Sequence, residues 1–162
     1  MQKAIMEQIR NMPLPEAVPD GAARARVTDG VTRGVLRLLL QQGFSPLAEF
    51  KLTSSRRIDV AGLDRAGRFL FVEVKSSLAD FRADGKWREY LDYCDWFYFA
   101  VAPGFPIDVL PADLGLIVAD HHEGAVLRAA PETPVNAARR RSQTLHFARS
   151  AAERLSLPQR PM

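Results

Sequence analysis

The sequence has little of what marks exported or membrane-spanning chains. It contains one cysteine, Cys94, so no internal disulfide can form, and a lone thiol fits a reducing compartment. The longest apolar run, residues 96–102, is about a third of the roughly 20 residues that cross a bilayer. Glu7 stands where a secretory signal would carry its apolar core. We therefore expect a cytoplasmic protein with no membrane contact.

Several catalytic patterns are absent as well. The chain has no glycine loop that would cradle a nucleotide phosphate, no zinc-ligand spacing and no Ser/His/Asp constellation. His121 and His122 are adjacent, so on an extended segment their rings would face opposite ways, and a turn is the simpler interpretation. His146 is a lone histidine on an expected helix, where we predict a structural role. The acidic and basic residues remain as the candidates for chemistry.

The charge is unevenly distributed. The whole chain carries a formal net charge of +3, whereas residues 128–162 hold seven arginines and two glutamates, a local balance of +5. The remaining 127 residues hold 15 basic and 17 acidic side chains. A basic segment can contact a polyanion, because Arg and Lys contacts with phosphate supply most non-specific nucleic-acid affinity. Arg139, Arg140 and Arg141 are the candidate DNA contacts, and a solvated basic helix is the alternative.

The chain length fits one cored domain, because 162 residues with 47% hydrophobic content are too few for two ordinary domains. Its start is rich in proline and shows no sustained period, so we expect an N-terminal arm at 1–22, one domain at 23–155 and a tail at 156–162. Apolar periodicity predicts the elements of the domain. The expected helices are 23–42, a second through 87–94, and 137–155, and the expected strands are 47–52, 57–63, 69–75, 96–101, 114–119 and 125–130.

The order of these elements predicts an α/β fold. Strands 47–52, 57–63 and 69–75 are joined by tight turns and should form an antiparallel meander. A helix then separates 69–75 from the apolar strand 96–101, so these two strands should lie parallel in one sheet. We expect a mixed sheet, made of an antiparallel meander and a parallel crossover strand, flanked by helices.

Three charged side chains lie in these central strands, where propensity disfavours acids. Glu73 and Lys75 point to the same face, because side chains alternate along a strand. Asp59 precedes Glu73 across the turn at 64–67, so strand pairing can bring the two carboxylates together. Close carboxylates repel unless a cation lies between them, and hard oxygen ligands suit Mg²⁺ or Mn²⁺. The alternative is an exposed strand face with a Glu73–Lys75 surface salt bridge.

This pattern resembles the PD-(D/E)XK nuclease superfamily of restriction enzymes, resolvases and repair exonucleases. The resemblance rests on Ile58-Asp59 followed by Glu73-Val74-Lys75 on consecutive strands, after one helix and before a crossover helix. A wider set of segments resembles the narrower MmcB-like family of bacterial DNA repair proteins. These segments are 56–60, 72–77, 80–82 and 86–95, within a similarity that covers about residues 23–118.

The resemblance implies a restriction endonuclease-like core and a role for each motif residue. Asp59 and Glu73 would bind the metal, the main-chain carbonyl of Val74 would be available to it, and Lys75 would be the catalytic lysine. The implied activity is Mg²⁺- or Mn²⁺-dependent hydrolysis of DNA phosphodiesters by a metal-activated water during repair. Ile58 stands where the motif has proline, which is a common variation.

Many relatives add an acid from the first helix. Here the candidates are Asp29 in that helix and Glu49 on the first strand.

Other polar neighbours of the motif have two interpretations each. Ser76 and Ser77 could donate to DNA phosphate, or Ser77 could start a helix in an S-x-x-D pattern, and Lys86 could assist Lys75 or lie in solvent at a helix end. Four aromatic residues could stack on bases, although their spacing favours the core: Trp87, Tyr90, Trp96 and Tyr98.

Two classes of function therefore follow from the sequence. The first is a metal-dependent DNA endonuclease or nuclease-like protein acting in DNA repair. The alternative is a non-catalytic DNA-binding or scaffolding repair factor that keeps the fold and uses its basic C-terminal segment with other repair proteins. RNA cleavage is a third possibility. The sequence indicates no oligomeric state.

Overall fold

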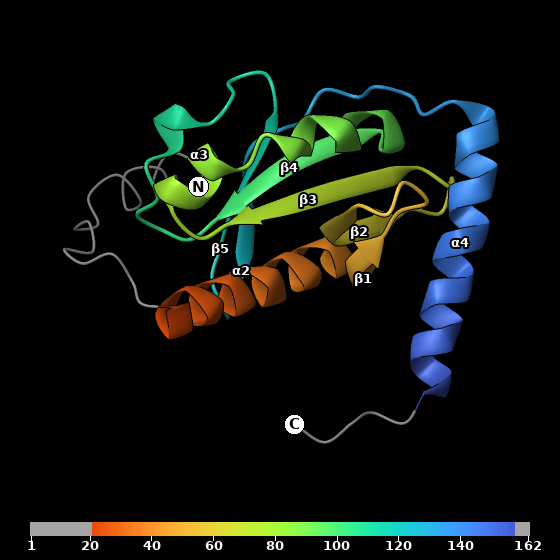
Figure 1. Ribbon diagram of the computed structural model, residues 1–162, viewed down its shortest axis with the longest axis horizontal. Coiled ribbons are helices and arrows are strands. Elements are labelled where there is room, and N and C mark those ends of the chain that lie inside the picture. Colours follow the sequence, from red (N-terminus) through yellow and green to blue (C-terminus); the bar gives the residue numbers. More distant parts are fainter. Residues whose placement is uncertain (1–20, 158–162) are drawn as a thin grey trace.

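The computed structural model describes residues 21–157, which form a six-stranded sheet with helical elements on both faces (Figure 1). The strands are β1 (Ser45–Lys51), β2 (Arg57–Leu63), β3 (Phe69–Lys75), β4 (Trp96–Val101), β5 (Gly115–Ala119) and β6 (Gly124–Arg128). The α-helices are α2 (Gly21–Gln41), α3 (Leu78–Ala83) and α4 (Ala137–Ser156), and the 3₁₀ helices are η1 (Lys86–Tyr93) and η2 (Ile107–Val109).

The strands lie across the sheet in chain order. β1, β2 and β3 form an antiparallel meander, because tight turns connect them. β3 to β4 and β4 to β5 are parallel pairs that need crossover connections, and β6 returns antiparallel to β5. The predicted α/β fold, with a mixed sheet of meander and parallel crossover strand between helices, is confirmed.

α2 covers one face of the sheet. Its buried residues Val31, Val35 and Leu39 belong to one apolar cluster with Val72 and Val74 of β3. The helix ends before Gly43, whose φ of 85° is the left-handed conformation that favours glycine after a helix. Since alternate side chains of β3 point to opposite faces, Glu73 and Lys75 lie on the face that α2 does not cover.

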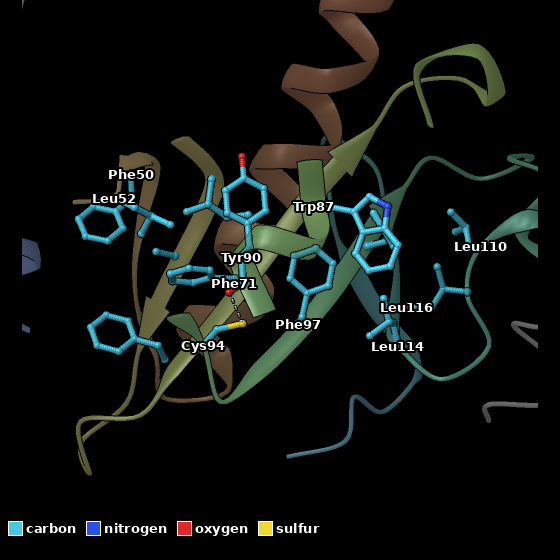
Figure 2. Packing of buried hydrophobic residues seen from close by; sticks show 14 of the residues in the cluster. Phe50, Leu52, Phe71, Trp87, Tyr90, Cys94, Phe97, Leu110, Leu114 and Leu116 are labelled. Carbon is cyan, nitrogen blue, oxygen red and sulfur yellow. Dashed lines mark hydrogen bonds between the residues drawn. The ribbon is translucent and has the colours of Figure 1, made fainter. Parts of the chain in front are cut away.

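η1 packs on that second face. Trp87 and Tyr90 stack on Phe97 of β4, with ring centroids 6.1 and 6.5 Å apart (Figure 2). Both side chains are almost fully buried, as is Tyr98 on the other face, so their interpretation as core residues is confirmed. Trp96 is partly buried against the α2 side of the sheet.

α4 lies beside β1, an edge strand of the sheet (Figure 1). Its side chains bond carbonyl groups of the β1 backbone: His146 Nε2 lies 2.7 Å from the carbonyl oxygen of Lys51, and Arg154 donates to the carbonyls of Ala48 and Glu49. Covering an edge in this way blocks pairing with another chain. The structural role expected for His146 is confirmed.

Several predicted boundaries need correction. The first helix begins at Gly21 rather than residue 23, and the first strand at Ser45 rather than 47. The second helix is not one amphipathic α-helix through 87–94: a short α3 ends at residue 83, and the 3₁₀ helix η1 follows. A 3₁₀ helix repeats every three residues, so its positions 87, 90 and 93 share a face. The two last strands are each shorter than predicted.

The expected N-terminal arm lies outside the described residues except for its last two, which begin α2. The expected tail likewise lies outside them after residue 157. Within residues 21–157, no helix combines the length and the apolar character that crossing a bilayer would require.

Candidate active site

The candidate site lies where β2 and β3 stop pairing. Their antiparallel register runs as far as Val60 opposite Val72. At the next pair of positions, Asp59 and Glu73 would face each other, but the backbone pairing of the two strands has ended. Here a side chain accepts from β3 in place of the β2 backbone: the N–H of Val74 donates to Asp59 Oδ2 at 2.7 Å. The Asp59 carboxylate is therefore held against β3 beside Glu73.

Glu73 and Lys75 are buried charges at the end of β3. Only 8% of Glu73 and 2% of Lys75 is exposed to solvent. Lys75 Nζ lies 3.3 Å from Glu73 Oε1, whereas nothing among residues 21–157 donates a hydrogen bond to the buried Glu73 Oε2. An unpartnered buried carboxylate oxygen is costly, so this atom is the most unusual feature of the site.

A third carboxylate, Asp84, contacts the lysine, and the sequence did not predict it. Lys75 Nζ lies 2.5 Å from Asp84 Oδ2, and Asp84 Oδ1 accepts the backbone N–H of Lys86 at 2.8 Å. Asp84 is the C-cap residue of α3. The available signal was Asp84-Gly85, a breaker pair that would end a helix started at Ser77, but the S-x-x-D start was only one of two interpretations and no end was assigned to such a helix.

Burial and like charge dominate the electrostatics. Burial, followed by the negative charge of Asp59, raises the pKa of Glu73 to about 8. Burial also raises the pKa of Asp59, against the opposing hydrogen bond from Val74. Burial lowers the pKa of Lys75, but the hydrogen bond to Asp84 and the charge of Glu73 outweigh it, so the net shift is upward and the ammonium stays charged. Burial and the charges of Glu73 and Asp59 raise the pKa of Tyr90 to about 12.

These properties fit a divalent cation. Asp59 and Glu73 offer two carboxylates, and the free Glu73 Oε2 is an oxygen for which a cation would supply the partner. Across residues 21–157 there is no group of three or more His, Cys, Asp or Glu side chains placed to hold a metal. Two carboxylates suffice for Mg²⁺, which keeps several waters and takes further oxygens from substrate phosphate. The donor set therefore fits Mg²⁺ or Mn²⁺ better than a cation that needs an all-protein cage.

Neither candidate for an additional acid is buried at the site. Glu49 has a φ of 50° between the paired positions 48 and 50, and its exposed carboxylate lies 3.5 Å from Arg57 Nη1. Asp29 is exposed on α2, the helix that covers the opposite face of the sheet. Besides Glu73, the acid that contacts Lys75 is Asp84.

The two serines after the motif start α3. Ser77 is its N-cap, and its Oγ accepts the backbone N–H of Asp80 at 3.1 Å, which confirms the S-x-x-D helix start. Ser76 donates from both its backbone N–H and its hydroxyl to Asp80 Oδ2. Lys86 begins η1 with an exposed side chain. A contact of any of the three with DNA phosphate stays a prediction.

The arginine run lies at the other end of β3. Arg140 forms an ion pair with buried Asp95, at 2.6 Å from its Oδ1, and also bonds the carbonyl of Gly67 just before β3. Arg139 and Arg141 are both exposed, and Arg139 donates to the carbonyl of Asp92 and lies over the Tyr93 ring. The structure does not bring these arginines to the carboxylates, and it makes Arg140 a structural link between α4 and the sheet.

The histidine pair forms the expected turn between β5 and β6. The carboxylate of Asp120 accepts the backbone N–H groups of His122 and Glu123. Arg37 of α2 donates to the carbonyls of His121 and His122, at 2.7 Å each. The pair therefore connects the turn to α2.

A mixed α/β sheet that places the half-buried Asp59 carboxylate beside the buried Glu73 and Lys75 at adjoining strand ends is consistent with the PD-(D/E)XK class of nuclease-like proteins. More narrowly, the chain belongs to the MmcB-like family of DNA repair proteins, whose family model matches residues 15–161. Membership in this family indicates a role in DNA repair and interaction with DNA.

One solved structure is also similar. The SPO1766 protein of unknown function from Silicibacter pomeroyi is 42% identical, with a TM-score of 0.77, and the match covers 80% of this chain and 88% of that one. No curated protein matches the chain.

Proposed function

We propose that this protein is a Mg²⁺- or Mn²⁺-dependent DNA nuclease acting in repair, with Asp59, Glu73 and Lys75 as its catalytic residues. The observation that carries the proposal is the buried Glu73 Oε2, which has no hydrogen-bond donor among the described residues and lies beside a second carboxylate. A fold that served stability alone would gain from pairing or replacing such an atom.

The roles of the residues follow from their positions. Asp59 and Glu73 would hold the cation, and the Val74 carbonyl is a further oxygen on the same strand end. A bound cation of this kind polarises a phosphodiester and lowers the pKa of a coordinated water. Lys75, kept charged by Asp84 and Glu73, would use a remaining N–H to bind a phosphate oxygen or to orient the attacking water.

A second candidate function has one observation in its favour. Lys75 is enclosed by two carboxylates, as in a purely structural ion-pair network, and such a network would suit a DNA-binding or scaffolding factor that does not cleave. That factor would bind DNA without metal and without need of Glu73.

The test is a cleavage assay on the purified full chain. Supercoiled, linear, single-stranded and branched DNA, with matched RNA, would be incubated with Mg²⁺, Mn²⁺ or a chelator. We expect metal-dependent nicking of DNA that is lost in Asp59→Asn and Glu73→Gln and kept in Asp113→Asn, an exposed aspartate outside the site. Nicking of none of the substrates, or nicking that survives in Glu73→Gln, contradicts the proposal.

A further inference from the structure

Asp84 lies at the site but is not part of the motif. It connects two parts of the molecule through its two oxygens: Oδ2 binds the ammonium of Lys75 at the end of β3, and Oδ1 accepts the backbone N–H that begins η1. With both oxygens bound, the orientation of this carboxylate is fixed by the junction between α3 and η1.

We propose that Asp84 is the positioning residue of this site: it takes the shorter contact with the Lys75 ammonium, limits the contact of that ammonium with Glu73, and so keeps the Glu73 carboxylate available to a divalent cation. The inference rests on the proposed function. It adds a residue that acts through Lys75 and does not itself bind the metal.

The distances indicate which carboxylate holds the lysine. Nζ lies 2.5 Å from Asp84 Oδ2 and 3.3 Å from Glu73 Oε1, so the shorter and stronger contact is with Asp84. The Lys75 side chain is 3% exposed, so water cannot replace a lost partner at little cost. An ammonium group has three N–H donors, and these two carboxylates account for two of them.

The consequence concerns competition for Glu73. Without the Asp84 charge, Glu73 would be the carboxylate still bonded to the buried ammonium. Nζ would then move toward Oε1 and neutralise the carboxylate that should bind the cation. Asp84 would thus support metal binding from outside the coordination sphere, as second-layer residues do in other metal sites.

Metal binding provides the first test. Asp84→Asn removes the charge but keeps an oxygen for the Lys86 N–H, so the junction between α3 and η1 should persist. Mn²⁺ titrated into the full chain, followed by calorimetry, should bind about 10- to 100-fold more weakly to this variant than to the parent. Asp92→Asn is the matched control, because it also removes one negative charge, from an exposed position in the last turn of η1. This variant should bind Mn²⁺ as the parent does.

A double-mutant cycle separates positioning from simple loss of charge. If Asp84 acts through Lys75, Asp84→Asn should have no further effect on Mn²⁺ affinity in the Lys75→Met background. An equal loss in both backgrounds would show that Asp84 acts by its charge alone and would overturn the proposal. Unchanged affinity in the single variant would overturn it as well.

A metal-free crystal structure of Asp84→Asn gives a readout that does not depend on metal binding. We expect Nζ closer to Glu73 than the 3.3 Å of the parent. If the parent neither binds Mn²⁺ nor nicks DNA, the proposed function fails. The position of Lys75 Nζ in the variant then tests the role of Asp84 by itself, and an ammonium that has not moved overturns that role. Should Asp84→Asn not fold, Asp84→Glu replaces it in each measurement, because one added methylene displaces the carboxylate and the lysine with it.

Discussion

At the scale of single residues, Glu73 should make the stability of the metal-free protein depend on pH. Its pKa is about 8 in the folded chain against an ordinary value of 4.5. Between these values the folded state binds the proton more tightly than the unfolded state, so the free energy of unfolding should fall as pH rises from about 4.5 to about 8. Above that range both states are ionised and this contribution is constant.

Glu73→Gln imitates the protonated side chain and should remove this pH dependence. We expect parent and variant to be similarly stable near pH 5, and the variant to be the more stable at pH 9 in the presence of a chelator. Urea unfolding across this range measures the difference. Identical pH profiles would mean that Glu73 ionises as easily in the folded chain as in the unfolded one.

Asp59 has a separable structural role, because its carboxylate accepts the N–H of Val74. Asp59→Ala leaves that buried N–H without an acceptor and should lower the free energy of unfolding by about 1–3 kcal/mol. Asp59→Asn keeps an oxygen there and should cost much less, although it should also abolish cleavage. Urea unfolding of both variants makes the comparison, and equal losses would show that the hydrogen bond contributes little.

At the scale of elements, the sequence predicted the bounds of the buried central strands more accurately than those of the less buried region after β3. β2, β3 and β4 begin and end where the sequence predicts, because short apolar runs bounded by turn residues specify central strands closely. The region after β3 was predicted poorly. The i, i+3 spacing of Trp87 and Tyr90 fits an α-helix and a 3₁₀ helix equally, and the contact of the Asp84 cap with Lys75 joins two elements that the sequence does not show to be neighbours.

The link between α4 and the sheet yields a second stability prediction. Arg140 pairs with Asp95, whose side chain is 1% exposed. Arg140→Ala leaves that carboxylate without its cation, although the N–H groups of Phe69 and Val135 remain, and should cost about 3 kcal/mol. The neighbouring and exposed Arg141→Ala should cost almost nothing. Chemical denaturation compares the two, and equal effects would contradict a structural role for Arg140.

At the scale of the whole molecule, the sequence predicted the fold class and the proximity of Asp59, Glu73 and Lys75, but not the contacts between distant segments. Alternation along β3 and pairing with β2 place Asp59, Glu73 and Lys75 together, so local rules were sufficient. Three adjacent arginines look alike in the sequence, and only the packing of α4 shows that Arg140 reaches a buried acid while Arg141 does not. The same holds for Asp84, whose partner lies in another element.

The central claim is that Asp59 and Glu73 together bind a divalent cation, and anomalous diffraction from crystals of the full chain grown with Mn²⁺ tests it most directly. We expect a manganese peak within coordinating distance of both carboxylates, with Glu73 Oε2 as a ligand, and no peak there in Glu73→Gln. Manganese bound only elsewhere, with Glu73 still paired to Lys75 alone, would contradict the account.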